Sequence, residues 1–272
     1  MKSLIKVYLF FILLILGTDL SAQQLSLCSW NIQNFGKSKS DNEIKFIAQT
    51  LKNFDVVCII EVVAGYGGAQ AVARLSDELN RTGSAWDYTI SDPTSSFTKG
   101  TERYAFLWRK SKLKKTGNAW LDKQFQNEIE REPYYITLIS GKQTFTIGVF
   151  HAIPTSKHPE TEIPFLAKIA QSRSNENLIF CGDFNCAESN TTFTSLKQLG
   201  FASAMQHQKT TLKSKQKGNE CLASEYDNVF YKKSKIKVEK TGIIPFHESF
   251  TDLKSARMIS DHLPIYFNFS LN

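Results

Sequence analysis

The sequence predicts an α/β sandwich, in which two packed β-sheets are flanked by helices. Short apolar runs typical of strands outnumber the amphipathic helical segments, and the two kinds are interspersed along the chain. No repeat, low-complexity tract or linker rich in Pro, Gly or Ser divides them. In one chain of 272 residues, this combination favours two sheets with helices on their outer faces.

The first residues have the features of a secretory signal peptide. Two lysines precede the apolar run 7–16, and small residues follow it. A membrane anchor is the alternative, but this run is about half of the roughly 20 residues needed to cross a bilayer. We therefore predict a signal peptide at residues 1–22, cleavage near Ala22, a secreted or periplasmic protein, and a single domain over residues 23–272.

The elements of the N-terminal half follow from hydrophobic periodicity and capping signals. Ser40 and Glu43 form a capping-box signature before a helical pattern, and the glycines at 67 and 68 open a second amphipathic helix. The predicted elements, in order, are a strand at 25–33, a helix at 44–51, a strand at 56–61 and a helix at 67–79.

The rest of the chain is richer in strands. Aromatic and β-branched residues alternate in short runs, and residues 141–143 form the turn between two of them. The predicted strands are 104–108, 134–139, 145–150, 178–181, 228–231, 236–239 and 264–269. One helix is predicted among them, at about 163–171.

Polar residues follow the apolar strands at the points where the strands end. Strand ends converge on one rim of a sandwich, so these side chains could meet in one cleft. Carboxylates can hold a Mg²⁺-type ion, imidazoles can move protons, and amides can hold phosphoryl oxygens. The set therefore suits phosphodiester hydrolysis. Its members are Asn31, Glu61, His151, Asp183, Asn185, Asp227, Asp261 and His262.

Eight short segments occur in the order seen in deoxyribonuclease I. They are CSWNIQNFG (28–36), IIEVV (59–63), ERYAFLWRK (102–110), REPYY (131–135), VFHAIPT (149–155), GDFN (182–185), EYDNV (225–229) and ISDHLP (259–264). One such segment alone is weak evidence of a relationship, but eight segments in the same order are specific to the family. The chain thus resembles a deoxyribonuclease I-like member of the endonuclease/exonuclease/phosphatase superfamily, which implies a four-layer α/β sandwich of two packed mixed β-sheets.

The resemblance also implies a metal site. Glu61 would be the principal ligand, with Asn31 and Asp261 completing or positioning the ion. Mg²⁺ is the expected metal, with Mn²⁺ or Ca²⁺ as alternatives. Taken alone, Glu61 would more simply be a cap at the end of a strand.

Catalytic roles carry over in the same way. His151 with Glu102, and His262 with Asp227, would flank the scissile phosphate, and a carboxylate partner lets an imidazole exchange a proton near neutral pH. Asn185 would donate to a non-bridging oxygen. We expect in-line attack by water, with His151 as a candidate acid for the 3′ oxygen; either Asp183 or His262 could take the proton of the water.

DNA is the expected substrate, double-stranded in the first instance. In the resemblance, Arg103 and Arg131 lie at or near the phosphate backbone, and the lysine-rich loop 209–217 is as compatible with phosphate contacts as with a solvated loop. The net charge of +7 attracts any polyanion. Val63 and Gly100 depart from the minor-groove residues of deoxyribonuclease I, so the preference among nucleic acids stays open.

The predicted function is thus a secreted, metal-dependent endonuclease that cuts DNA with little sequence specificity. The alternative is a phosphatase or phospholipase of the inositol-phosphate or sphingomyelin type. A sphingomyelinase would carry an exposed apolar loop for membrane docking, and none is evident, so we expect no stable membrane association. We also expect a monomer.

Export permits a disulfide, and the chain has five cysteines. Cys28, Cys58 and Cys181 lie in apolar runs and are expected in the core. Cys186 and Cys221 lie in polar segments and are the predicted pair, a bridge that the resemblance also implies. Structural calcium is not expected, because the acidic loops that would hold it are replaced.

Overall fold

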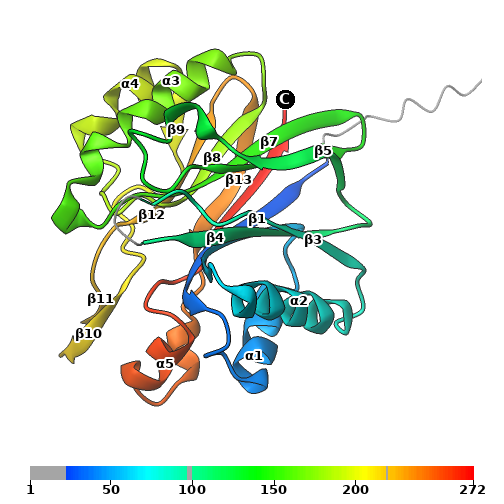
Figure 1. Ribbon diagram of the computed structural model, residues 1–272, viewed down its shortest axis with the longest axis vertical. Helices are drawn as coiled ribbons and strands as arrows, with labels where there is room; N and C mark the ends of the chain where they lie inside the picture. The colour runs from blue at the N-terminus through cyan, green and yellow to red at the C-terminus, as the bar shows by residue number, and fades with distance from the viewer. Residues whose placement is uncertain (1–22, 97–99, 219) are drawn as a thin grey trace, which may run out of the picture.

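The computed structural model describes residues 23–96, 100–218 and 220–272, so the predicted signal peptide lies outside the described residues (Figure 1). Among the helices of these three segments, none combines the length and the apolar composition that crossing a membrane requires.

Two six-stranded sheets form the centre of the molecule. The first has the order β13-β14-β1-β2-β4-β3 and the second β5-β6-β7-β8-β12-β9. Both are mixed, because β1 runs parallel to β2 and β7 parallel to β8 while the other pairs are antiparallel. The first sheet contains β1 (Leu25–Phe35), β2 (Val56–Val63), β3 (Trp86–Ile90), β4 (Glu102–Arg109), β13 (Ile236–Ile243) and β14 (Ile265–Leu271). The second contains β5 (Lys114–Leu121), β6 (Tyr134–Ser140), β7 (Gln143–His151), β8 (Leu178–Asp183), β9 (Phe201–Ser203) and β12 (Asp227–Lys232).

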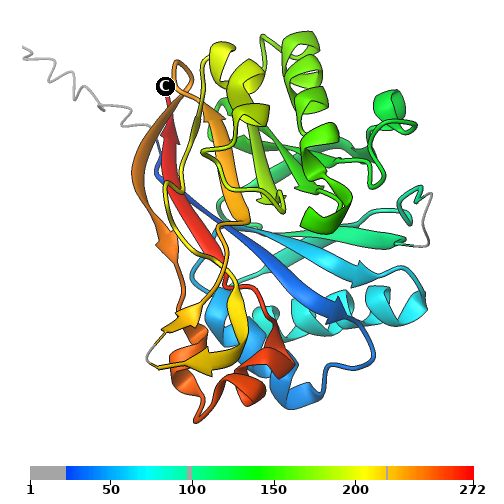
Figure 2. The ribbon, with the colours of Figure 1, turned by 90° about the vertical axis from the view of Figure 1, so that its left-hand side faces the viewer.

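Helices cover the outer faces of both sheets. Those beside the first sheet are α1 (Asp41–Leu51), α2 (Tyr66–Asn80) and α5 (Leu253–Ile259). Those beside the second are α3 (Pro164–Ser172) and α4 (Thr194–Gln198). Short 3₁₀ turns occur at Lys123–Phe125, Thr155–Lys157, Pro159–Thr161, Thr191–Phe193 and Phe246–Ser249. Figure 2 shows the resulting order of helices, sheet, sheet and helices, which confirms the predicted four-layer sandwich.

Three clusters of buried side chains hold these layers together. The inner cluster lies between the sheets and includes Ile60 and Phe106 from one sheet and Ile136 and Val229 from the other. Each sheet also has one outer cluster, which lies between the sheet and the helices that cover it. Burying apolar surface at about 25 cal/mol per Å² is the main force that keeps the two sheets together.

The predicted start of helix α1 is confirmed by its capping interactions. Ser40 accepts a hydrogen bond from the backbone N–H of Glu43, and the Glu43 carboxylate accepts one from the backbone N–H of Ser40, so the capping box forms as predicted. The periodic apolar residues of α1 then face the core.

The cysteines require one correction. Cys28, Cys58 and Cys181 are buried as predicted, but Cys186 is a free thiol, so the predicted bridge to Cys221 is absent. Cys186 packs against the helical layer of the second sheet, whereas Cys221, on β11 (Glu220–Leu222), packs against that of the first. The two residues thus belong to different layers.

Gly182 is the tightest point between two strands that lead to the polar rim. Its φ is +140°, and a Cβ at this position would lie 1.9 Å from the backbone oxygen of Phe150. No residue but glycine permits β7 and β8 to approach this closely.

We therefore expect Gly182→Ala to lower the free energy of unfolding by about 2–4 kcal/mol, from steric overlap plus backbone strain. Gly200→Ala is the matched control, since Gly200 also has a positive φ but has open space where a Cβ would lie. Urea denaturation of both variants measures the difference. Equal losses for the two would refute the role given to the close approach.

Candidate active site

Three of the predicted residues are neighbours on adjacent strands of the second sheet. His151 at the end of β7 pairs with Asp183 at the end of parallel β8, and Asp227 at the start of antiparallel β12 pairs with the same Asp183. The register alone therefore places Asp183 between the other two. All three are buried.

The first sheet contributes Asn31 and Glu61 across an irregular stretch. The pairing of β1 with β2 shifts register after Asn31, and Glu61 adopts a left-handed backbone with φ +61°. Asn34, near the end of β1, has φ +52°. Non-glycine residues in this conformation cost free energy and concentrate at functional sites. Here the strain turns Glu61 toward Asn31, whose Nδ2 donates to Glu61 Oε1 over 3.1 Å.

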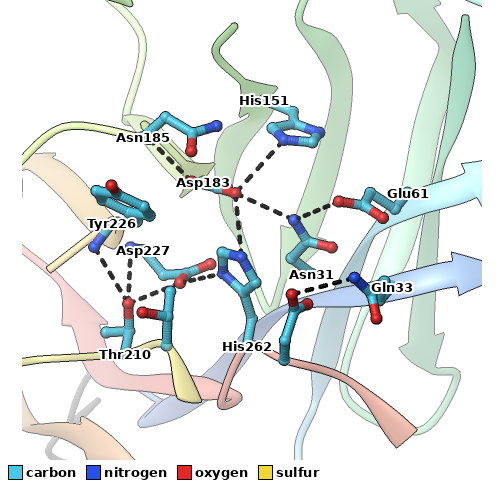
Figure 3. A network of polar contacts seen from close by, with 12 residues as sticks. Asn31, Gln33, Glu61, His151, Asp183, Asn185, Thr210, Tyr226, Asp227 and His262 are labelled. Atoms are coloured by element: carbon cyan, nitrogen blue, oxygen red, sulfur yellow. Dashed lines mark hydrogen bonds and ion pairs between the residues drawn. The ribbon is translucent and has the colours of Figure 1, made fainter. Parts of the chain in front are cut away.

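The two sheets meet at Asp183 (Figure 3). Asn31 Nδ2 also donates to Asp183 Oδ2 over 3.1 Å, so one amide links the carboxylates of Glu61 and Asp183. The other Asp183 oxygen accepts the backbone N–H of Asn185 over 2.9 Å. The predicted metal and catalytic residues thus form one continuous network.

Both predicted histidine–carboxylate pairs are present. His151 Nδ1 lies 2.9 Å from Glu102 Oε1, and His262 Nδ1 lies 2.7 Å from Asp227 Oδ2. The opposite ring atoms, both Nε2, face Asp183 Oδ2 at 3.4 Å and 3.6 Å. Two oriented imidazoles therefore converge on one carboxylate.

The two imidazoles differ in charge. Burial, reinforced by the nearby Arg131 guanidinium, lowers the pKa of His151 to about 4. Burial would also lower the pKa of His262, but the Asp227 and Asp183 carboxylates outweigh it and raise the pKa to about 10. At neutral pH His151 is neutral and His262 is cationic. This distribution favours His262 over His151 as the proton donor, whereas the sequence suggested His151.

Arg131 is placed to organise the site. Its guanidinium donates to the backbone oxygens of His151 and Ala152 and lies 3.5 Å from Glu102 Oε2. Burial raises the pKa of Glu102 to about 7, against the pull of Arg131. Since Arg131 is only 8% exposed, this geometry favours a role in holding Glu102 and His151 over a direct phosphate contact.

The other predicted polar residues are more accessible. Asn185 is half-buried, with Nδ2 donating to the Ala152 oxygen over 3.0 Å. Arg103 is also half-buried, and its guanidinium donates to the backbone oxygens of Ala64 and Ser91, each over 2.7 Å. A phosphate contact by Arg103 stays a prediction.

Three positioning residues were not predicted. Thr210 Oγ1 donates to Asp227 Oδ2 over 2.7 Å and fixes the partner of His262. Ser260 Oγ donates to the backbone oxygen of Asn31 over 2.6 Å and accepts a hydrogen bond from the backbone N–H of His262. It therefore links a predicted metal ligand to a predicted catalytic histidine. Gln33 Nε2 donates to Asp261 Oδ2 over 3.1 Å. Ser260 stands in the ISDHLP motif that signalled the site, but nothing in the sequence around Thr210 marks it.

The sequence pattern of a known family covers almost the whole described chain. Residues 28–262 match the endonuclease/exonuclease/phosphatase family. The chain belongs to this family.

Curated relatives and solved structures agree with this assignment. The chain is 27% identical to a deoxyribonuclease from Thioalkalivibrio sp. (strain K90mix), covering 96% of this chain and 75% of the relative. It is 25% identical to human deoxyribonuclease gamma, covering 94% and 89%. A family protein from Bacteroides thetaiotaomicron has a similar fold, with a TM-score of 0.67, 15% identity and coverage of 92% and 99%. The human Nocturnin catalytic domain gives a TM-score of 0.63 at 17% identity, covering 92% and 94%.

Members of the endonuclease/exonuclease/phosphatase family generally depend on a divalent metal, and the donors of this chain fit one. Asn31 Oδ1 is buried and has no hydrogen-bond partner among the described residues, and the half-buried Glu61 carboxylate lies beside it. Oxygen donors of this kind suit Mg²⁺ or Mn²⁺. Asp261, the third predicted ligand, instead accepts from Gln33 and Arg257 through Oδ2, which favours positioning over direct ligation.

A second group of potential ligands overlaps the predicted catalytic residues. Donor atoms of Asp183, Asp227 and His262 lie within 4.8 Å of one another, the one such group found among the described residues. The direct 2.7 Å hydrogen bond between His262 and Asp227 would have to break for a cation to lie between those two atoms. This geometry favours proton transfer for this group and leaves the Asn31–Glu61 pair as the candidate metal ligands.

Proposed function

We propose that this chain is a secreted, metal-dependent endonuclease that hydrolyses the phosphodiester bonds of DNA with little sequence specificity. The observation that carries the proposal is the convergence of two oriented imidazole Nε2 atoms on Asp183, beside the Asn31–Glu61 oxygens. Curated relatives named deoxyribonuclease over most of the chain support DNA as the substrate. Export rests on the signal-like start at residues 1–22.

Each side chain has a role in in-line attack by water on phosphorus. Asp183 would orient the attacking water, and Asn185 would rotate from Ala152 to donate to a non-bridging oxygen as its charge grows. The histidines would move protons at the attacking and leaving oxygens. A divalent ion held by Glu61 and Asn31 would supply Lewis-acid stabilisation of the same charge.

A plasmid-nicking assay tests the proposal. We expect nicking with Mg²⁺ and its loss with a chelator. Glu61→Gln keeps the shape of the side chain but removes its charge, so we expect the Mg²⁺ concentration for half-maximal rate to rise at least about tenfold, as for other weakened metal sites. Glu78→Gln, which removes a surface charge on α2, is the control and should match the parent.

Two results would count against the proposal. Release of phosphate from an inositol phosphate or of a headgroup from sphingomyelin, without nicking, would favour a phosphatase or phospholipase. Undiminished nicking in the presence of the chelator would exclude metal dependence.

A further inference from the structure

A cavity of about 520 Å³ opens directly beside His262. The residues that line it include Lys213 and Lys215 of the hairpin formed by β10 (Leu212–Lys217) and β11, Arg257 of α5, Asp261, and His262 itself. Its volume falls in the range of roughly 300–1,000 Å³ typical of ligand sites. The segment predicted as a loop is thus a structured wall, formed by β10 (Leu212–Lys217) and β11 (Glu220–Leu222).

The hairpin is fixed to the catalytic rim through its backbone. Thr211 forms an isolated antiparallel bridge with His262, and the Leu212 N–H donates to the Asp261 oxygen over 2.7 Å. Arg257 Nη1 donates to the Leu212 backbone oxygen over 2.8 Å. Figure 1 shows β10 and β11 beside α5. The cavity therefore keeps a defined position relative to His262.

Among the described residues, three of the four acidic, lysine or arginine side chains that line the cavity are positive, and the fourth is the Asp261 carboxylate. Lys215 is exposed. Within the part of the chain that the structure describes, Lys213 is paired with Glu220, whose carboxylate lies 2.6 Å away; the Lys213 side chain is 23% exposed and that of Glu220 is 73% exposed. An ion pair with so exposed a partner is weak, so an incoming anion can compete for Lys213. Arg257 contributes a third positive charge, although it also contacts Asp261 at 3.3 Å.

We propose that this cavity binds a phosphate of the polynucleotide next to the scissile one, on the His262 side, through Lys213 and Lys215. The inference rests on the proposed function and narrows it, because a substrate with a single phosphate has no second phosphate to reach the cavity. It makes the enzyme selective for polymeric substrates.

The double variant Lys213→Gln/Lys215→Gln tests the cavity. Each phosphate of duplex DNA that a protein neutralises contributes about 0.9 to the magnitude of the slope of log affinity against log salt, so loss of this one phosphate contact is expected to reduce that magnitude by about 0.9. Binding of a fluorescein-labelled DNA duplex, measured without metal between about 50 and 200 mM salt, gives this slope. In cleavage assays the KM for DNA should rise several-fold, while kcat at saturating DNA stays close to the parent.

A change of the opposite sign provides a second test. Glu220→Gln releases Lys213 from its ion pair and should lower the KM for DNA. Glu239→Gln removes an equal charge from an ion pair with Lys237 on β13 and should leave the KM for DNA unchanged. Lys233→Gln, in the turn at the far end of β12 from Asp227, is a control for the lysine variants.

The outcomes separate the two proposals. If the parent cuts DNA but the double lysine variant has the salt slope and KM of Lys233→Gln, the cavity does not bind phosphate and the proposed function stands. If Glu220→Gln and Glu239→Gln behave alike, site-specific binding is also rejected. If the parent neither binds nor cuts DNA, both proposals fail.

Discussion

Asp183→Asn is expected to lower the rate of DNA cleavage at saturating substrate by about 10³-fold or more, within the range of lost acid–base groups. One oxygen of Asp183 faces both imidazole Nε2 atoms and accepts from Asn31, and the other accepts from Asn185. An asparagine has the same shape but must present an NH₂ group to one set of these partners. It also removes the negative charge beside the cationic His262.

Initial nicking rates at saturating DNA and Mg²⁺ measure the effect. Circular dichroism and thermal unfolding would show that the variant is folded. Asp77→Asn, an exposed position on α2, is the matched control and should retain the parent rate. A folded Asp183→Asn protein that cuts within about tenfold of the parent would remove Asp183 from the acid–base chemistry.

Much of this site was accessible from the sequence, because its residues directly follow buried strands. Residues such as Glu61 and Asp183 stand where an apolar run stops, and strand ends meet at one rim of a sandwich. The ordered motifs then paired each histidine with its carboxylate, and the structure brings both pairs together. The position of polar residues at strand ends, together with the resemblance to deoxyribonuclease I, therefore predicted most members of the hydrogen-bond network around Asp183.

Polar edge strands were harder to predict. β5 (Lys114–Leu121) is partly exposed along its length and includes Gly117 with φ +66°, so it has no apolar alternation to detect. β10 is rich in lysine, and it is held by the bridge between Thr211 and His262, a contact far apart in the sequence. Such strands are stabilised by contacts with residues distant in the sequence, and hydrophobic periodicity carries no information about those contacts.

The environment of individual side chains was also not predictable from the sequence. The motif around Arg131 indicated a positive charge near the phosphate, but not that its guanidinium would be buried against backbone oxygens and Glu102. That burial favours a positioning role for Arg131 over a direct phosphate contact. The pKa values of His151 and His262 shift in opposite directions for the same reason: burial and then Arg131 lower the pKa of His151, whereas the Asp227 and Asp183 carboxylates outweigh burial and raise that of His262.

His151→Asn and His262→Asn are each expected to lower the rate of DNA cleavage by about 10²–10⁴-fold, the usual effect of removing a general acid or base. Initial rates at saturating DNA, on variants shown to be folded, measure each loss. His158→Asn, whose side chain is 76% exposed, is the control and should retain the parent rate. A folded variant of either histidine that cuts as fast as the parent would exclude that residue from catalysis.

The double variant His151→Asn/His262→Asn is the more discriminating experiment. Both Nε2 atoms lie within 3.6 Å of the same Asp183 oxygen, and in the proposed mechanism the two imidazoles act on one phosphate in one step. Groups that act as a unit are strongly non-additive, and the residual rate then reflects binding and charge stabilisation by the remaining residues. We therefore expect the double variant to lose at most about tenfold more than the worse single variant. A loss equal to the product of the two single losses would mean that the histidines act independently, and the shared site built around Asp183 would have to be abandoned.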